Sequence, residues 1–305
     1  MTATTERTTD SFADRLAHAV TSKESCLVVG LDPVIEKLPD ALQPASGATD
    51  RDAAAAAILE FNLGVLDAIE PYACAVKPQI AFYEPFGPAG YQAWERTIEA
   101  AHDRGLLVIG DIKRGDIGST AAAYASAHLG PSRYQSDAIT VNPYFGTDGM
   151  APFVETARAE SGGLFVLVRT SNPTASELQD LTAGGQHLHE HVADLVNGWG
   201  ANLVGEGGYS SIGAVVGATA PEALGRLRER MPRAWFLVPG VGAQGGAARD
   251  VIPAFDGRGL GAVVNASRGI LYAFRSEPES TWTTAVTSAA RTLRDELRLA
   301  AQASS

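Results

Sequence analysis

The chain has 305 residues, of which 45% are hydrophobic and 19% charged, a composition typical of a globular protein with a sizeable core. Its formal net charge of −11, without any basic tract, argues against nucleic acid and anionic membrane surfaces as partners. The sequence also lacks the apolar run of roughly 20 residues that would predict a membrane span.

Residues 1–25 are predicted to form a polar tail followed by a helix. The first residues, MTATTERTTDSFADRL, carry acidic side chains and lack the apolar core of a signal peptide. Cys26 and Cys74 lie in or beside apolar runs, which indicates core thiols in a reducing compartment and not a disulfide framework. We therefore expect a cytoplasmic protein in which residues 26–305 form one catalytic domain.

Short runs rich in valine, isoleucine and leucine recur along the rest of the chain. Continuous apolar runs of this kind are typical of strands that are buried on both faces of a parallel sheet. The predicted strands are residues 26–31, 73–76, 106–109, 138–141, 164–168, 212–216, 235–238 and 261–264. The predicted helices between and after them are residues 51–69, 89–104, 120–128, 149–159, 186–198, 221–230, a short one from Gly246, and 281–300.

Strands that alternate with helices eight times predict an α/β fold, a (β/α)₈ TIM barrel. A doubly wound open sheet is the alternative. It is disfavoured because the first strand is followed by LDP, whereas a dinucleotide-binding turn would have the sequence GxGxxG.

Charged residues follow each of the first three predicted strands. Asp32 follows the first (GLDP) and Lys77 ends the second (AVKPQ). The third runs into DIKRGDIGST, which contains Asp111, Lys113 and Asp116. Since barrel enzymes carry their chemistry at the carboxyl ends of the strands, these charges should share one rim. We interpret them as an alternating Lys–Asp–Lys–Asp array in which Lys113 donates a proton. A purely structural salt-bridge cluster is the alternative.

The segment DIKRGDIGST resembles the D-x-K-x-x-D motif of orotidine 5′-phosphate decarboxylases, including Thr120 four residues after the second aspartate. Related sugar-phosphate barrels share this motif but place a magnesium-binding glutamate where this chain has Lys77. Further matches follow strands five, seven and eight in the family's order: Ser171 (RTSNP), Gly242 and Gln244 (PGVGAQGG), and Arg268 (NASRGI). The resemblance covers residues 26–271, and RTSNP and VNPYFGTDG are similar to the family's longer bacterial type 2 branch.

The resemblance implies decarboxylation of orotidine 5′-phosphate to uridine 5′-phosphate without metal or cofactor, with Lys113 protonating C6 of the pyrimidine. Asp111 would lie against the substrate carboxylate, while Lys77 and Asp32 would hold ribose hydroxyls. Asp116 and Thr120 would reach into the site of a neighbouring subunit, which implies a homodimer.

The resemblance also assigns the two ends of the substrate. Ser171 would contact the pyrimidine edge, and Gln244 would span from the pyrimidine to the phosphate. Arg268 would bind the phosphate in a bidentate manner. Independently of the resemblance, loops after strands seven and eight are where such barrels bind phosphate, through backbone N–H groups at glycines such as Gly242.

Two other functions remain open from the sequence. A magnesium-dependent 3-keto-sugar-phosphate decarboxylase or hexulose phosphate synthase would need an acidic ligand where Lys77 stands. A non-catalytic nucleotide-binding barrel would gain nothing from a buried charge array. The histidines of HLHEH, residues 187–191, fall in a predicted helix away from the strand ends, so we expect them on a solvent-facing helix surface and not in a metal site.

Overall fold

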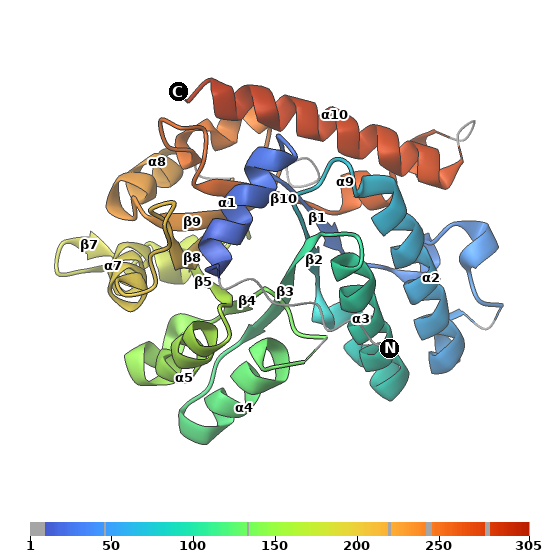
Figure 1. The fold of residues 1–305 in the computed structure, drawn as a ribbon, viewed down its shortest axis with the longest axis horizontal. Coiled ribbons are helices and arrows are strands. Elements are labelled where there is room, and N and C mark those ends of the chain that lie inside the picture. Colours follow the sequence, from blue (N-terminus) through green and yellow to red (C-terminus); the bar gives the residue numbers. More distant parts are fainter. Residues whose placement is uncertain are drawn as a thin grey trace.

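The structure is a computed structural model that describes residues 10–45, 47–132, 134–218, 221–241, 246–277 and 281–304. Its parallel strands close into an eight-stranded barrel in the order β1-β10-β9-β8-β5-β4-β3-β2, as the sequence predicted. Figure 1 shows these strands at the centre of the molecule with helices around them. The barrel strands are β1 (Leu27–Leu31), β2 (Ala75–Pro78), β3 (Leu107–Arg114), β4 (Ala138–Val141), β5 (Gly163–Arg169), β8 (Ser210–Val216), β9 (Ala234–Pro239) and β10 (Ala262–Ala266).

The outer helices begin and end within a turn of their predicted bounds. They are α2 (Arg51–Ile69), α3 (Gly87–His102), α4 (Gly118–Leu129), α5 (Gly146–Ala159), α7 (Leu188–Gly200), α8 (Pro221–Arg230) and α10 (Trp282–Gln302), with short α6 (Ser176–Gln179) and α9 (Arg268–Leu271). The 3₁₀ turns are η1 (Ile35–Lys37), η2 (Asp40–Leu42), η3 (Gly47–Thr49), η4 (Ile80–Phe82), η5 (Glu84–Phe86), η6 (Pro143–Phe145), η7 (Ala248–Ala254) and η8 (Ala273–Ser276). Among the described helices, none combines the length and the apolar character that a membrane crossing requires.

The barrel strands are buried along most of their length, which explains their unbroken apolar sequences. Every residue of β1, β8 and β10 is buried, because one face of each strand packs inside the barrel and the other packs under the helices. Helix α2 illustrates how the covering layer forms. Asp50 caps its first turn by accepting hydrogen bonds from the backbone N–H groups of Asp52 and Ala53, and its apolar face, which includes Ile58 and Phe61, is buried.

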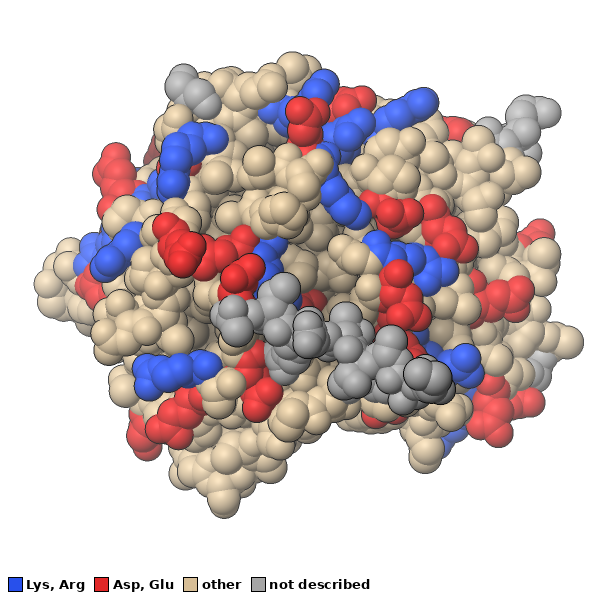
Figure 2. All heavy atoms as spheres, viewed as in Figure 1, with Lys and Arg blue, Asp and Glu red and all other residues tan. Residues whose placement is uncertain are grey.

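Helix α1 (Phe12–Ser22) covers the amino-terminal end of the barrel (Figure 1). The Phe12 ring packs edge-on against Phe165 at 5.9 Å between centroids. It also lies so close to Gly163 that a Cβ atom at this position would be 2.1 Å from the ring. Asp14 accepts hydrogen bonds from the backbone N–H groups of residues 206 and 207 at 3.0 and 2.8 Å. On the face of the molecule seen in Figure 2, basic side chains are interspersed with acidic ones and do not gather into one patch.

A small antiparallel hairpin, β6 (Thr182–Ala183) and β7 (Gln186–His187), lies between α6 and α7 and was not predicted. Helix α7 therefore starts at Leu188, two residues later than expected, and the Glu190 carboxylate accepts a hydrogen bond from the His187 backbone N–H at 2.7 Å. The expectation of solvent-facing histidines is wrong for His189. Its ring is buried, and its Nδ1 lies 2.9 Å from the carbonyl oxygen of Gln179.

Candidate active site

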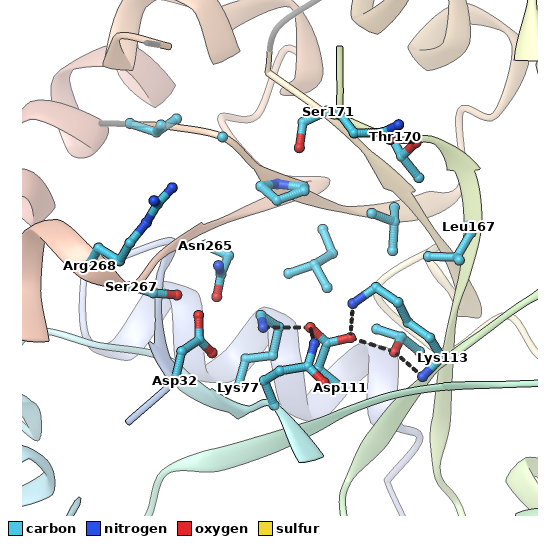
Figure 3. A pocket seen from close by; sticks show the side chains of 18 of the residues that line it. Asp32, Lys77, Asp111, Lys113, Leu167, Thr170, Ser171, Asn265, Ser267 and Arg268 are labelled. Carbon is cyan, nitrogen blue, oxygen red and sulfur yellow. Dashed lines mark hydrogen bonds and ion pairs between the residues drawn. The ribbon is translucent and has the colours of Figure 1, made fainter. Parts of the chain in front are cut away.

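A cavity of about 480 Å³ opens at the carboxyl ends of the barrel strands. This is the end at which barrel enzymes carry their chemistry, because eight loops with separate sequences converge there. The cavity wall includes six of the residues that the sequence singled out (Figure 3): Asp32, Lys77, Asp111, Lys113, Ser171 and Arg268.

The carboxylate of Asp111 is the centre of the hydrogen-bond network in this cavity. Its Oδ2 accepts from Lys77 Nζ at 2.7 Å and from Gln79 Nε2 at 2.8 Å. Its Oδ1 accepts from Lys113 Nζ at 2.6 Å and from Thr140 Oγ1 at 2.8 Å. A carboxylate has about four lone-pair sites, so these donors satisfy it fully and fix its orientation.

The two lysines that flank Asp111 differ in exposure. The side chain of Lys77 is 6% exposed, and that of Lys113 is 47% exposed. Burial raises the pKa of Asp111, but the charges of Lys77 and Lys113 outweigh it and hold this pKa well below its ordinary value. Burial lowers the pKa of Lys77, but the charges of Asp111 and Asp32 outweigh it and leave the pKa raised. Both groups of the buried pair are therefore ionised at neutral pH.

The backbone of Lys113 is in the left-handed region, with φ at 46°. For a residue with a side chain this conformation costs roughly 1–2 kcal/mol, so the surroundings must enforce it. In this conformation the ammonium group turns back onto Asp111 beside the cavity (Figure 3). An ammonium group has three N–H donors and Asp111 receives one, so the arrangement can present a positive charge and a proton to a ligand.

Two buried acceptors lie across the cavity from Lys113. Asp32 Oδ1 and Asn265 Oδ1 have no hydrogen-bond partner within the described part of the chain. Figure 3 shows both side chains and that of Ser267 directed toward one another. A Cβ atom at position 30 would lie 2.0 Å from Ser267 Oγ and 3.2 Å from Asn265 Oδ1, so this grouping requires Gly30. Buried acceptors without donors cost about 1–3 kcal/mol each, and hydroxyl groups of a ligand would relieve that cost.

The loop after β5 forms another wall, with Thr170, Ser171 and Asn172 facing the cavity. It is held from outside by Gln179, which accepts from the Thr170 backbone N–H at 2.9 Å and donates to Thr170 Oγ1 at 2.7 Å. Arg169 binds Gln179 and Asp180, each at 3.1 Å. The segment between β5 and α7 thus supports the cavity wall.

Arg268 begins the short helix α9 at the mouth of the cavity. Its side chain is exposed. Its guanidinium makes no hydrogen bond or ion pair with other residues that the structure describes, and Figure 3 shows it pointing toward the cavity. An unpaired guanidinium can bind a phosphate through two parallel N–H bonds.

Two of the predicted site residues, Asp116 and Thr120, are not brought to this cavity. Asp116 lies outside the cavity wall, and its Oδ1 accepts a hydrogen bond from the Ile117 backbone N–H at 2.8 Å. Thr120 is exposed on α4. Gly242 and Gln244 lie outside the described residues. Within one chain, the array therefore contains Lys77, Asp111 and Lys113.

Sequence reasoning missed three uncharged members of the site: Gln79, Thr140 and Asn265. Gln79 is two residues beyond Lys77, and Asn265 is three residues before Arg268, so their places beside strand ends were a usable signal. Thr140 sits within the apolar run of β4, where a single threonine gives no indication of function.

The chain is similar to known proteins over nearly its whole length. The family model for the orotidine 5′-phosphate decarboxylase / HUMPS family matches residues 25–283. The orotidine 5′-phosphate decarboxylase of Rhodopirellula baltica is 45% identical over 299 residues, covering 94% of this chain and 99% of the relative. The enzyme of that name from Deinococcus radiodurans is 42% identical over 290 residues, covering 95% of this chain and 97% of the relative. The solved structure of Leishmania donovani OMP decarboxylase has a TM-score of 0.76 and 35% identity, covering 95% of this chain and 98% of that chain.

Proposed function

Because the chain belongs to the orotidine 5′-phosphate decarboxylase / HUMPS family, we propose that it converts orotidine 5′-phosphate to uridine 5′-phosphate, the last step of de novo UMP synthesis. The observation that carries this proposal is Asp111 hydrogen-bonded between two lysines, with Lys113 beside the cavity. An ammonium ion and a carboxylate held at one point suit a reaction that expels a carboxyl group and replaces it with a proton.

The chemistry uses groups of the chain and the substrate, together with one proton from solvent. The C6–carboxyl bond breaks, carbon dioxide leaves, and the electron pair remains at C6. Lys113 stabilises that developing charge and forms the new C6–H bond with one of its protons. Asp111 lies against the departing carboxylate, and their repulsion is relieved as carbon dioxide leaves. Lys113 then regains a proton from solvent, which its half-exposed side chain can reach.

The remaining site residues bind the ribose, the phosphate and the pyrimidine edge of the nucleotide. Lys77 and Asp32 hold the ribose hydroxyls, and the unpaired acceptors Asp32 Oδ1 and Asn265 Oδ1 support this assignment. Arg268 binds the phosphate, together with Gly242 and Gln244 of the loop after β9, and Ser171 contacts the pyrimidine edge. Binding energy from the distant phosphate then holds the ring against Lys113.

We further propose that the protein is a homodimer in which Asp116 and Thr120 complete the partner's site. Large apolar side chains lie exposed near them: Ile117 is 53% exposed, and Tyr144 and Phe145 of η6 are 80% and 47% exposed. The Asp116 backbone packs against the start of α5, next to η6. Grouped exposed apolar residues are typical of a protein interface. Two buried free cysteines, Cys26 and Cys74, support a cytoplasmic location, and we regard residues 26–305 as one catalytic domain.

An absorbance assay with orotidine 5′-phosphate, with and without EDTA, tests the function. We expect turnover at the same rate in both samples. Turnover of a 3-keto-sugar phosphate that chelator abolishes would favour the magnesium-dependent relatives. That alternative is disfavoured because Lys77 places an ammonium 2.7 Å from Asp111, where a divalent cation would need an acidic ligand. Tight binding of uridine 5′-phosphate without any turnover would instead indicate a non-catalytic binding protein.

A further inference from the structure

We propose that Thr140 is a positioning residue of this site, whose hydroxyl group holds the backbone of Lys113 and the carboxylate of Asp111 in one fixed arrangement. This inference rests on the proposed decarboxylase function and adds a residue to it. Thr140 lies in β4, is 1% exposed, and has its side chain at the cavity.

The Thr140 hydroxyl uses both of its hydrogen-bonding capacities within the site. Its Oγ1 accepts from the Lys113 backbone N–H at 3.0 Å and donates to Asp111 Oδ1 at 2.8 Å. Lys113 Nζ donates to the same Oδ1 at 2.6 Å. The three groups thus form a closed ring, in which the Thr140 hydroxyl links the Lys113 backbone N–H to the carboxylate that binds the Lys113 ammonium group.

The pairing of β3 with β4 explains why a side chain is needed at this point. Gly110 pairs with Ile139, and Arg114 pairs with Val141, so residues 111–113 of β3 lie opposite Thr140 alone. In this irregular stretch the backbone N–H of Lys113 bonds to the threonine side chain instead of a β4 carbonyl. A bulge next to an active site re-aims side chains, and this one carries the left-handed residue Lys113.

The hydroxyl, and not the bulk, of Thr140 is therefore the functional element. Valine has nearly the same shape but would leave the Lys113 N–H without its acceptor and remove one donor from Asp111. The ammonium group would then lose its fixed direction toward the reacting carbon. Misplacement of a reacting group by about 1 Å can lower the rate roughly 100-fold. Phosphate and pyrimidine contacts come from other strands, so substrate affinity should change little.

The test compares Thr140→Val and Thr140→Ser with Thr97→Val as a matched control. Thr97 is a fully buried threonine of α3 that lies away from the cavity wall. Like that of Thr140, its hydroxyl both donates and accepts: it donates to the Ala93 carbonyl oxygen at 2.7 Å and accepts from Asn62 Nδ2 at 3.1 Å. Steady-state kcat and KM for orotidine 5′-phosphate are measured for each variant, together with its thermal unfolding. If Thr140→Val does not fold, Thr140→Ala, which also removes the hydroxyl, takes its place.

We expect Thr140→Val to lower kcat by about 10- to 100-fold with KM within about threefold of wild type, and Thr140→Ser to restore most of kcat. Thr97→Val should lose stability but keep kcat. A Thr140→Val enzyme with wild-type kcat, or one in which KM alone rises, would overturn the inference. Failure of the wild-type chain to act on orotidine 5′-phosphate would contradict the proposed function instead, before any variant is compared.

Discussion

Lys77 and Lys113 bond to opposite oxygens of one carboxylate, yet their surroundings give them different chemistry. Lys77 is buried beside Asp32 and Asp111, which raise its pKa and keep it charged. Lys113 is half-exposed, so it can meet both a ligand in the cavity and the solvent that would return its proton. Exposure thus separates a lysine that fixes the orientation of Asp111 from one that can transfer a proton.

Replacing Lys113 with alanine tests the proton-donor role. Because the variant loses both the proton and the charge next to C6, we expect kcat to fall by at least about 1,000-fold. The affinity for uridine 5′-phosphate should stay within about tenfold, since other residues hold the ribose and phosphate. Turnover is measured by absorbance and product binding by calorimetry. A variant that retains wild-type kcat would remove Lys113 from the mechanism.

At the level of single residues, the sequence revealed the charged members of the site and Ser171, but it missed other uncharged members. Lys77, Asp111 and Lys113 were recognisable because burying a charged side chain next to a buried strand is costly unless the charge is paired or serves a function. Gln79 and Thr140 are common in ordinary strands and turns, and their bonds to Asp111 depend on strand register. Register in a closed barrel depends on all eight strands together, so no local pattern encodes it.

Among the elements, the interface between α3 and α4 contains a buried titratable group. His128 of α4 packs edge-on against Trp94 of α3, at 6.4 Å between ring centroids. Burial, together with the positive charge of Arg114, lowers the pKa of His128 to about 4. The ring is therefore neutral in the folded protein well below the pH at which a free histidine becomes charged.

This difference predicts acid sensitivity. Between about pH 6.5 and pH 4 the unfolded chain binds a proton at position 128 and the folded chain does not, so the free energy of unfolding falls as pH falls. His128 lowers the free energy of unfolding by at most about 3 kcal/mol over this pH range. His128→Phe should make urea unfolding less dependent on pH in this window. His18→Gln, on the exposed side of α1, should keep the wild-type dependence. If the free energy of unfolding depends on pH equally in both variants, groups other than His128 cause the acid sensitivity.

The regular elements were predictable because their apolar runs are long enough to identify. All eight barrel strands appeared as such runs, and α2 has its predicted bounds. The hairpin of β6 and β7 was missed because each strand has two residues, too few for a periodic pattern. Burial of His189 was missed for a related reason: the segment that covers it belongs to this hairpin and to α6, and its position is set by contacts rather than by helix periodicity.

For the whole molecule, the proposed sharing of sites between two subunits makes a quantitative prediction. Asp111→Ala and Asp116→Ala homodimers should each be inactive. When the two variants are refolded together in equal amounts, half of the dimers should be hybrids. Each hybrid has one site in which both aspartates are intact. Activity should therefore recover to about a quarter of the wild-type value, as follows from two-fold symmetry. Absence of any recovery, with hybrid dimers detected by mass spectrometry, would show that each site is complete within one chain.

The packing of α1 over the amino-terminal end of the barrel has a consequence for folding during synthesis. Its apolar face packs on β5, and the Ala13 backbone N–H donates to Ser211 Oγ, 198 positions further along the chain. At about 5–20 residues per second, a ribosome needs roughly 10–40 s to make that stretch. During this time Phe12 and Leu16 have no complete surface to cover them. Helix α1 is thus made well before its docking surface, and its apolar face stays uncovered until the sixth barrel strand, β8, has been synthesised.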